Sequence, residues 1–147
     1  MKIAIGCDPN AQEYKETLIE YIESLGHELT DYGSDDAIYA NVAFEVAEAV
    51  AAGKQDRGIL LCGTGIGVSI AANKVKGAYA ANVSNVYQAQ RASLSNDANI
   101  ITMGSQVIGP ELAKCLIKEY LSGQFDPNGR SAPKVGSIVD YEKRHMG

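Results

Sequence analysis

The segment GILLCGTGIGVSIAANK, residues 58–74, holds the residue types and spacing that point most directly to chemistry. An apolar run ends at Cys62, and three glycines follow within the next five residues. Glycines let backbone N–H groups crowd toward a ligand, and the helix that starts after them adds partial positive charge. Such a loop can hold a phosphate or a developing enolate oxygen, although tight strand-to-helix packing also explains the glycines. The spacing fits neither the dinucleotide pattern G-x-G-x-x-G nor a nucleotide P-loop.

Two roles are open for Cys62 on spacing alone. A thiol beside a helix N-terminus is favoured as thiolate and would suit a general base, whereas a core cysteine is the commoner case. Cys7 and Cys115 fit the core role better, and we expect Cys115 on the apolar face of its helix. The three cysteines are an odd number without metal-type spacing, which is typical of free thiols in a reducing cytoplasm. With only two histidines in the chain, we expect no metal site.

Further candidate residues lie in polar segments elsewhere in the chain. Asp8, in CDPNA, can cap the following helix or hydrogen-bond substrate hydroxyls. Packing is the simpler role for Tyr39, and a turn is the simpler role for SNDAN, residues 95–99. Arg130 and Lys134 lie four residues apart in the tail, which is usual for a solvated surface pair. A phosphate clamp needs the same two charges.

Short apolar runs alternate with helical patterns along the chain. This alternation implies a doubly wound, five-stranded α/β fold with a parallel sheet, and in such sheets ligands bind at the carboxyl ends of the strands. We predict one domain over residues 1–147, with a tail that starts as a loop and ends in a helical extension. The predicted strands are residues 2–6, 27–33, 58–62, 78–83 and 99–104, and the predicted helices are residues 10–25, 42–53, 65–74, 85–94 and 110–123.

The composition is that of a globular protein, with 46% apolar and 21% charged residues among 147. The net charge of −5 argues against a nucleic-acid or anionic-membrane surface, but it allows a local basic pocket for a small phosphate. No run approaches the roughly 18 apolar residues of a membrane span, and Met1 leads directly into a strand pattern rather than a signal peptide. We therefore expect a cytoplasmic protein without a membrane or nucleic-acid partner.

Four blocks of the sequence resemble one known family, ribose-5-phosphate isomerase B together with the galactose-6-phosphate isomerase subunits. In chain order they are KIAIGCD, GILLCGTGIGVSIAANKVKG, SNDANIITMGSQVIGPELAK and NGR, and they span nearly the whole chain. The resemblance implies a Rossmann-like fold and a cofactor-free, metal-free aldose–ketose isomerase of a sugar phosphate. It also implies a homodimer or homotetramer with active sites between subunits, in which the tail, residues 124–147, packs on the partner.

The same resemblance implies roles for individual residues. A base moves a proton between C1 and C2 of the sugar through a cis-enediol(ate), and Cys62 matches that base. In another branch a glutamate does this from the position of Val68, so the valine supports the cysteine version. Thr64 would help to move the hydroxyl proton. The other matches are an anion hole made by the backbone N–H groups of Gly63, Gly65, Ile66 and Gly67, substrate positions at Asp8, Tyr39 and Ser95, a sugar contact by Asn96 from the partner chain, and phosphate binding by Arg130 and Lys134.

Departures from the family pattern bear on the substrate. Pro9 replaces a histidine near the phosphate, Gln106 replaces an arginine, and Ser95 replaces the histidine credited with opening the sugar ring. A tetrose 4-phosphate carries its phosphate on O4 and cannot close a furanose, so it needs no ring-opening acid. We therefore predict interconversion of D-erythrulose 4-phosphate and D-erythrose 4-phosphate, as in the branch found in erythritol-type catabolism. The alternatives are a ribose-5-phosphate isomerase and a non-catalytic partner subunit that binds a sugar phosphate.

Overall fold

The computed structural model describes all 147 residues of the chain. Every predicted strand and helix is present, and the predicted helical extension follows the last of them. None of the helices is both long and apolar enough to cross a membrane. The elements are β1 (Lys2–Cys7), η1 (Pro9–Ala11), α1 (Gln12–Ser24), β2 (Glu28–Asp31), α2 (Tyr39–Ala51), β3 (Arg57–Cys62), α3 (Ile66–Ala72), β4 (Ala80–Asn82), α4 (Val86–Leu94), β5 (Ile100–Gly104), α5 (Pro110–Ser122) and α6 (Ala132–His145).

The five strands form one sheet in the order β2-β1-β3-β5-β4, and every neighbouring pair is parallel. From β1 the chain moves outward to β2, and from β3 it moves outward in the opposite direction. The order therefore reverses between β1 and β3, which is where ligands bind in doubly wound sheets. This confirms the predicted doubly wound parallel fold, and it makes the ends of β1 and β3 the first place to look for a site.

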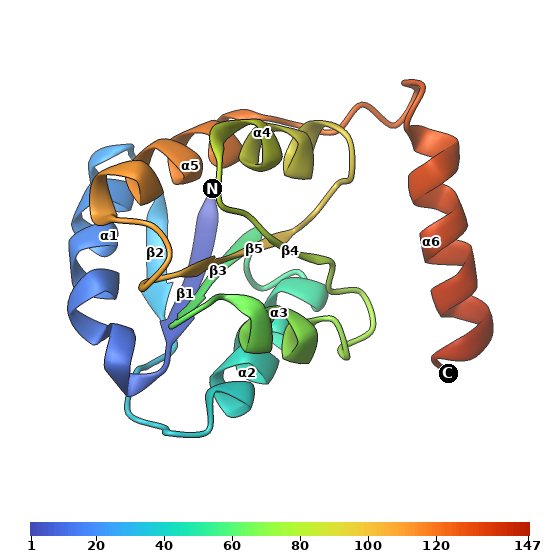
Figure 1. The fold of residues 1–147 in the computed structure, drawn as a ribbon. Coiled ribbons are helices and arrows are strands. Elements are labelled where there is room, and N and C mark those ends of the chain that lie inside the picture. Colours follow the sequence, from blue (N-terminus) through green and yellow to red (C-terminus); the bar gives the residue numbers. More distant parts are fainter.

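Helices cover both faces of the sheet (Figure 1). On one face α5 packs against both α1 and α4, and a core of 20 buried residues lies between these helices and the strands. On the other face α2 packs against α3 over a second core of 12 buried residues. The central strand β3 supplies both cores because Ile59, Leu60 and Leu61, all fully buried, alternate between the faces. Its continuous apolar sequence is thus explained by burial on both sides.

The largest difference from the predicted boundaries is at α2, which begins at Tyr39 rather than at residue 42. Polar contacts start the helix before its apolar pattern does. The Asp36 carboxylate accepts hydrogen bonds from the Ile38 N–H and from the Asn41 side chain, both at 2.8 Å. This earlier start places Tyr39 at the first turn of the helix, where its ring can reach the start of α3.

The two cysteines assigned to the core differ from each other. Cys7 is buried at the end of β1, as predicted, but Cys115 is exposed, so the prediction for Cys115 is wrong. The buried positions of α5 are Ala113, Leu116, Ile117, Tyr120 and Leu121. At about 100° per residue Cys115 lies on the side of the helix opposite Ala113 and away from the other buried positions.

This difference predicts distinct thiol reactivities. Burial raises the pKa of the Cys7 thiol to about 12, whereas Cys115 is open to solvent. Because the thiolate is the reactive form, we expect Cys7 to be labelled about 1,000-fold more slowly than Cys115 in the native protein at pH 8. Labelling with a disulfide reagent followed by peptide mass spectrometry measures the labelling rates of both cysteines. Equal labelling of the two cysteines in native protein would contradict the burial of Cys7.

The C-terminal helix α6 stands away from both helical layers (Figure 1). It has no buried residue, and Ile138 and Tyr141 are 53% and 60% exposed. Its main polar attachment is Glu142, whose carboxylate accepts from the Tyr79 hydroxyl at 2.9 Å and from the Gly77 N–H at 3.1 Å. Polar contacts therefore hold the orientation of α6, while Ile138 and Tyr141 remain uncovered.

Candidate active site

The first group of predicted residues lies at the carboxyl ends of β1 and β3. Cys7 pairs with Leu61 across these strands, and the Asp8 N–H donates to the Leu61 carbonyl at 3.4 Å. Asp8 therefore lies beside Cys62. The Cys62 side chain is only 6% exposed, and its Sγ accepts a hydrogen bond from the Gly65 N–H at 3.1 Å. The first N–H group of the loop to approach the thiol is therefore that of Gly65.

The loop after Cys62 is fixed by tight packing on β5 and β4. Gly65 has a φ of +79°, and a Cβ there would lie 2.7 Å from the Met103 carbonyl carbon and 2.8 Å from Asn82 Oδ1. The buried Thr102 hydroxyl donates to the Gly65 carbonyl at 2.7 Å. Only glycine satisfies both the backbone conformation and the space at residue 65. The spacing of the glycines left open either an anion-binding loop or tight packing, and tight packing explains the glycine at residue 65.

Gly63 and Thr64 differ from Gly65 in facing open space. A Cβ at Gly63 would meet no atom within 4 Å, so packing does not require a glycine there. Thr64 is exposed, and its Oγ1 accepts a hydrogen bond from the Ile66 N–H at 3.1 Å. The loop therefore has an accessible backbone at Gly63, and two of its N–H groups are directed at the Cys62 sulfur and the Thr64 hydroxyl.

Asp8 and Tyr39 complete this group. The Asp8 carboxylate accepts a hydrogen bond from the Ala11 N–H at 3.2 Å and so caps the short helix η1. Capping was one of the two roles that we predicted for Asp8. The Tyr39 ring lies against Gly67, since a Cβ on that glycine would be 2.5 Å from ring carbons. We call this group the thiol half-site; it comprises Asp8, Tyr39, Cys62 and residues 63–67. Val68, the position of the alternative base, is fully buried in the core.

The second group lies around a cavity of about 400 Å³ between the end of α4 and the start of α6. Four of the predicted residues line it together, although they come from two distant segments of the sequence. Two residues that sequence reasoning did not select, Tyr87 and Arg91, line it as well. We call this cavity the cation half-site, and the residues that concern its chemistry are Arg91, Ser95, Asn96, Arg130 and Lys134.

The three cations of this cavity are not neutralised within the chain. The salt bridges of the chain are Lys15 with Asp31 and Lys114 with Glu111, and neither involves Arg91, Arg130 or Lys134. The net charge of the chain is −5, so the gathering of unpaired cations in one cavity is a local reversal of the overall charge. A cavity of this kind suits a small anion with several charges, such as a phosphate.

Ser95 is held within this cavity by its neighbour on the preceding turn. The Arg91 Nε–H donates to the Ser95 Oγ at 2.6 Å. The signal for Arg91 in the sequence was its position four residues before Ser95, which places both on one side of the end of α4. Neither histidine of the chain takes the place of a titratable group here. His27 contacts the amino group of Met1, and His145 stacks on Tyr141 at the end of α6.

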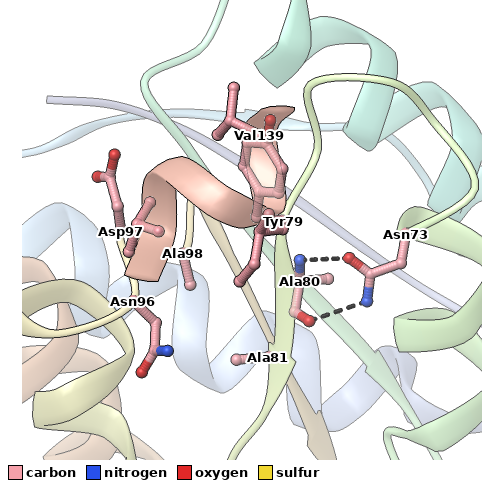
Figure 2. A pocket seen from close by; sticks show the side chains of 10 residues that line it. Asn73, Tyr79, Ala80, Ala81, Asn96, Asp97, Ala98 and Val139 are labelled. Carbon is pink, nitrogen blue, oxygen red and sulfur yellow. Dashed lines mark hydrogen bonds between the residues drawn. The ribbon is translucent and has the colours of Figure 1, made fainter. Parts of the chain in front are cut away.

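The two half-sites do not share a cavity within the chain. An apolar cavity of about 280 Å³ lies under α6, between Val139 and Tyr79 on one side and Asn96 and Asp97 on the other (Figure 2). Asn73 closes its far edge with two hydrogen bonds to Ala80. No residue of the thiol half-site lines this cavity or the cation half-site. No group of three or more His, Cys, Asp or Glu side chains could hold a metal ion.

Comparisons with known proteins place the chain among isomerases. A sequence model of the family described as Ribose/Galactose Isomerase matches residues 3–138. The chain is 49% identical to the D-erythrulose-4-phosphate isomerase of Pectobacterium atrosepticum, over 97% of this chain and 95% of that protein. It is 45% identical to the ribose-5-P isomerase B of Listeria innocua, over 99% of each. The solved ribose-5-phosphate isomerase B of Clostridium thermocellum has a TM-score of 0.92 and 40% identity, over 99% of each chain.

Proposed function

Because the chain belongs to the Ribose/Galactose Isomerase family, and is thus a sugar-phosphate aldose–ketose isomerase, we propose that it interconverts D-erythrulose 4-phosphate and D-erythrose 4-phosphate. The observation that carries the four-carbon substrate is Ser95. Its hydroxyl stands where the family resemblance has a ring-opening histidine, and it is engaged by Arg91. A serine hydroxyl is too weak an acid to protonate a ring oxygen, and neither histidine lines the cavity.

An open-chain substrate removes the need for that acid. Closure of a furanose requires a free hydroxyl at C4 or C5, and in a tetrose 4-phosphate O4 carries the phosphate. Ribose 5-phosphate and the hexose 6-phosphates are mostly cyclic and must be opened before C1 and C2 can react. The relative in Pectobacterium atrosepticum, named for erythrulose 4-phosphate, supports the same choice at 49% identity.

The proposed chemistry is a proton transfer between adjacent carbons. The Cys62 thiolate removes a proton from C1 of erythrulose 4-phosphate, which leaves a cis-enediolate, and then returns a proton to C2. The hydroxyl proton moves from O1 to O2 in the same step, with Thr64 as its carrier. The enediolate oxygen faces the backbone N–H groups of Gly63 and Gly67, which stabilise its charge, whereas the N–H groups of Gly65 and Ile66 are engaged by the Cys62 sulfur and the Thr64 hydroxyl. No atom is gained or lost, as isomerisation requires.

A complete site needs both half-sites, and we place them together across a subunit interface. The exposed apolar side chains around them support this arrangement. Ile66 and Ile70 of α3, next to the thiol half-site, are 53% and 59% exposed, and α6 presents Ile138 and Tyr141 beside the cation half-site. A second copy of the chain, in a homodimer or in a pair of dimers, would cover these surfaces with the tail of residues 124–147 and bring Asn96, Arg130 and Lys134 to the thiol.

Ribose 5-phosphate is the second candidate substrate. It is favoured by the relative in Listeria innocua, at 45% identity, and by the solved structures that match this fold. In that case Ser95 or Asn96 would have to assist ring opening, or the ring would have to open without help. Both routes predict slow turnover of a cyclic substrate, whereas an open tetrose phosphate would not be limited in this way.

A substrate panel on the purified chain tests the proposal. We expect kcat/KM for erythrulose 4-phosphate to exceed that for ribose 5-phosphate by at least about 100-fold, since general acid catalysis of ring opening contributes that much or more. Galactose 6-phosphate serves as the hexose control and should react no faster than ribose 5-phosphate. Turnover of ribose 5-phosphate without turnover of erythrulose 4-phosphate would overturn the proposal. Turnover of no sugar phosphate at all would favour a non-catalytic partner subunit.

A further inference from the structure

We propose that Arg91 is a third phosphate-binding residue and adapts the cation half-site to a short sugar phosphate. The inference deepens the proposed function and rests on it for the identity of the sugar. Its evidence is independent of the substrate, however, because it lies in the contacts of Arg91 itself. The role differs from that of a general surface cation at the end of a helix, which would interact only with the dipole of α4.

The hydrogen bond to Ser95 fixes the direction of the guanidinium. Arg91 uses its Nε–H on the Ser95 hydroxyl at 2.6 Å, and the chain provides no partner for its two terminal nitrogens. Both residues line the same cavity as Arg130 and Lys134. A guanidinium held at Nε presents its terminal N–H groups as a fork, which matches two oxygens of a phosphate. Ser95 is then a positioning residue for Arg91.

The charge distribution at the carboxyl edge of the sheet supports the same assignment. A cavity of about 460 Å³ near Asp8 is lined by Asn10, Glu13 and Gln106 among other residues and contains no cation. Lys15 is buried and committed to Asp31 at 2.7 Å. Of these two cavities, only the cation half-site offers positive charge to a dianionic phosphate. In the family pattern a histidine and an arginine stand at the positions of Pro9 and Gln106. We infer that Arg91 supplies positive charge that these two replacements remove.

The location of Arg91 also bears on the length of the sugar. Arg130 and Lys134 approach the cavity from the start of α6, whereas Arg91 approaches from the end of α4, next to Asn96. The amide of Asn96 can hydrogen-bond sugar hydroxyls. A phosphate shared by all three cations lies nearer to Asn96 than one bound by the α6 cations alone. This position suits a substrate with fewer carbons between its phosphate and its hydroxyls.

The test uses inorganic phosphate as the probe, measured by calorimetry on the intact protein. We expect Arg91→Gln to weaken phosphate binding about tenfold, because it removes one charge-assisted contact that is partly screened by solvent. Arg91→Lys keeps the charge without the fork and should lose less. Ser95→Ala removes the hydrogen bond that positions Arg91 and should lower phosphate affinity about threefold. Lys54→Gln is the matched control, since it removes one exposed charge outside the cavity and should leave phosphate affinity unchanged.

The outcomes separate this inference from the proposed function. Unchanged phosphate affinity in Arg91→Gln, with a melting temperature equal to the wild type, would overturn the role of Arg91 whatever the substrate. If Arg91→Gln weakens phosphate binding but the wild-type protein converts ribose 5-phosphate and not erythrulose 4-phosphate, the phosphate-binding role of Arg91 would stand. The proposed tetrose phosphate substrate would then be rejected. With the tetrose established, we further expect Arg91→Gln to raise KM for erythrulose 4-phosphate about tenfold and to change kcat less. A loss confined to kcat would contradict a phosphate-binding role.

Discussion

Replacement of Cys62 by alanine is expected to lower kcat/KM about 1,000-fold while the protein still folds. The expected size follows from the role of a general base, which contributes 10²–10⁴. The position of the alternative base is occupied by Val68, which has no titratable group, and neither histidine lies in a half-site. Cys62→Ser tests the same point with a side chain of similar shape, and its far less acidic hydroxyl should leave it nearly as inactive. The measurement is the rate of erythrulose 4-phosphate isomerisation.

Matched variants separate loss of the base from loss of the fold. Cys62 belongs to the core under α2 and α3, so Cys62→Ala removes some packing and is expected to lower the melting temperature slightly. Cys115→Ser changes an exposed thiol and should keep full activity. If Cys62→Ala retained activity within tenfold of the wild type, Cys62 would not be the base. A second group would then have to be sought near Asp8 and Thr64.

A randomly paired, equimolar population of two inactive variants is expected to regain about a quarter of the wild-type activity. The first variant is Cys62→Ala, and the second carries Arg130→Ala with Lys134→Ala, which should cost at least about 100-fold in kcat/KM because two charged phosphate contacts are lost. If each active site takes its thiol from one subunit and its cations from the other, a mixed dimer has one intact site and one doubly defective site. Random pairing of equal amounts makes half of the dimers mixed, so about a quarter of all sites are intact.

The recovery depends on the separation of the half-sites. Within the chain neither the cation half-site nor the cavity under α6 contains a residue of the thiol half-site. Co-expression with two affinity tags isolates the mixed dimers, in which one of the two sites is intact and about half of the wild-type activity is expected. Each variant mixed with itself is the control. Absence of any recovery in an isolated mixed oligomer would mean that both half-sites of one site come from the same chain.

Local sequence patterns account for most of the fold. A continuous apolar run such as that of β3 has few alternatives to a buried parallel strand, and glycines or proline end or start the helices around it. The edge strands are less predictable because a neighbour lies on one side only. For this reason the edge strands are shorter than predicted. β2 spans Glu28–Asp31 instead of residues 27–33, and β4 spans Ala80–Asn82 instead of residues 78–83.

The errors and omissions arise where function or burial depends on distant segments. Cys115 lies between Lys114 and Leu116, and the packing of α5 on α1 and α4 buries the opposite side of the helix. Arg91 is unremarkable until the start of α6 brings Arg130 and Lys134 to the same cavity. The separation of the half-sites is likewise a property of the folded chain. The thiol half-site, by contrast, is predictable because its residues follow two adjacent strands.

A competition reaction tests the central claim, that the chain is a tetrose phosphate isomerase, most directly. Erythrulose 4-phosphate and ribose 5-phosphate are mixed in equal amounts with the wild-type protein in D₂O and followed by NMR, so the ratio of their initial rates equals the ratio of their kcat/KM values. We predict conversion of erythrulose 4-phosphate to erythrose 4-phosphate with deuterium at C2, at least about 100-fold faster than ribose 5-phosphate reacts. Preferential conversion of ribose 5-phosphate, with erythrulose 4-phosphate unchanged, would contradict it.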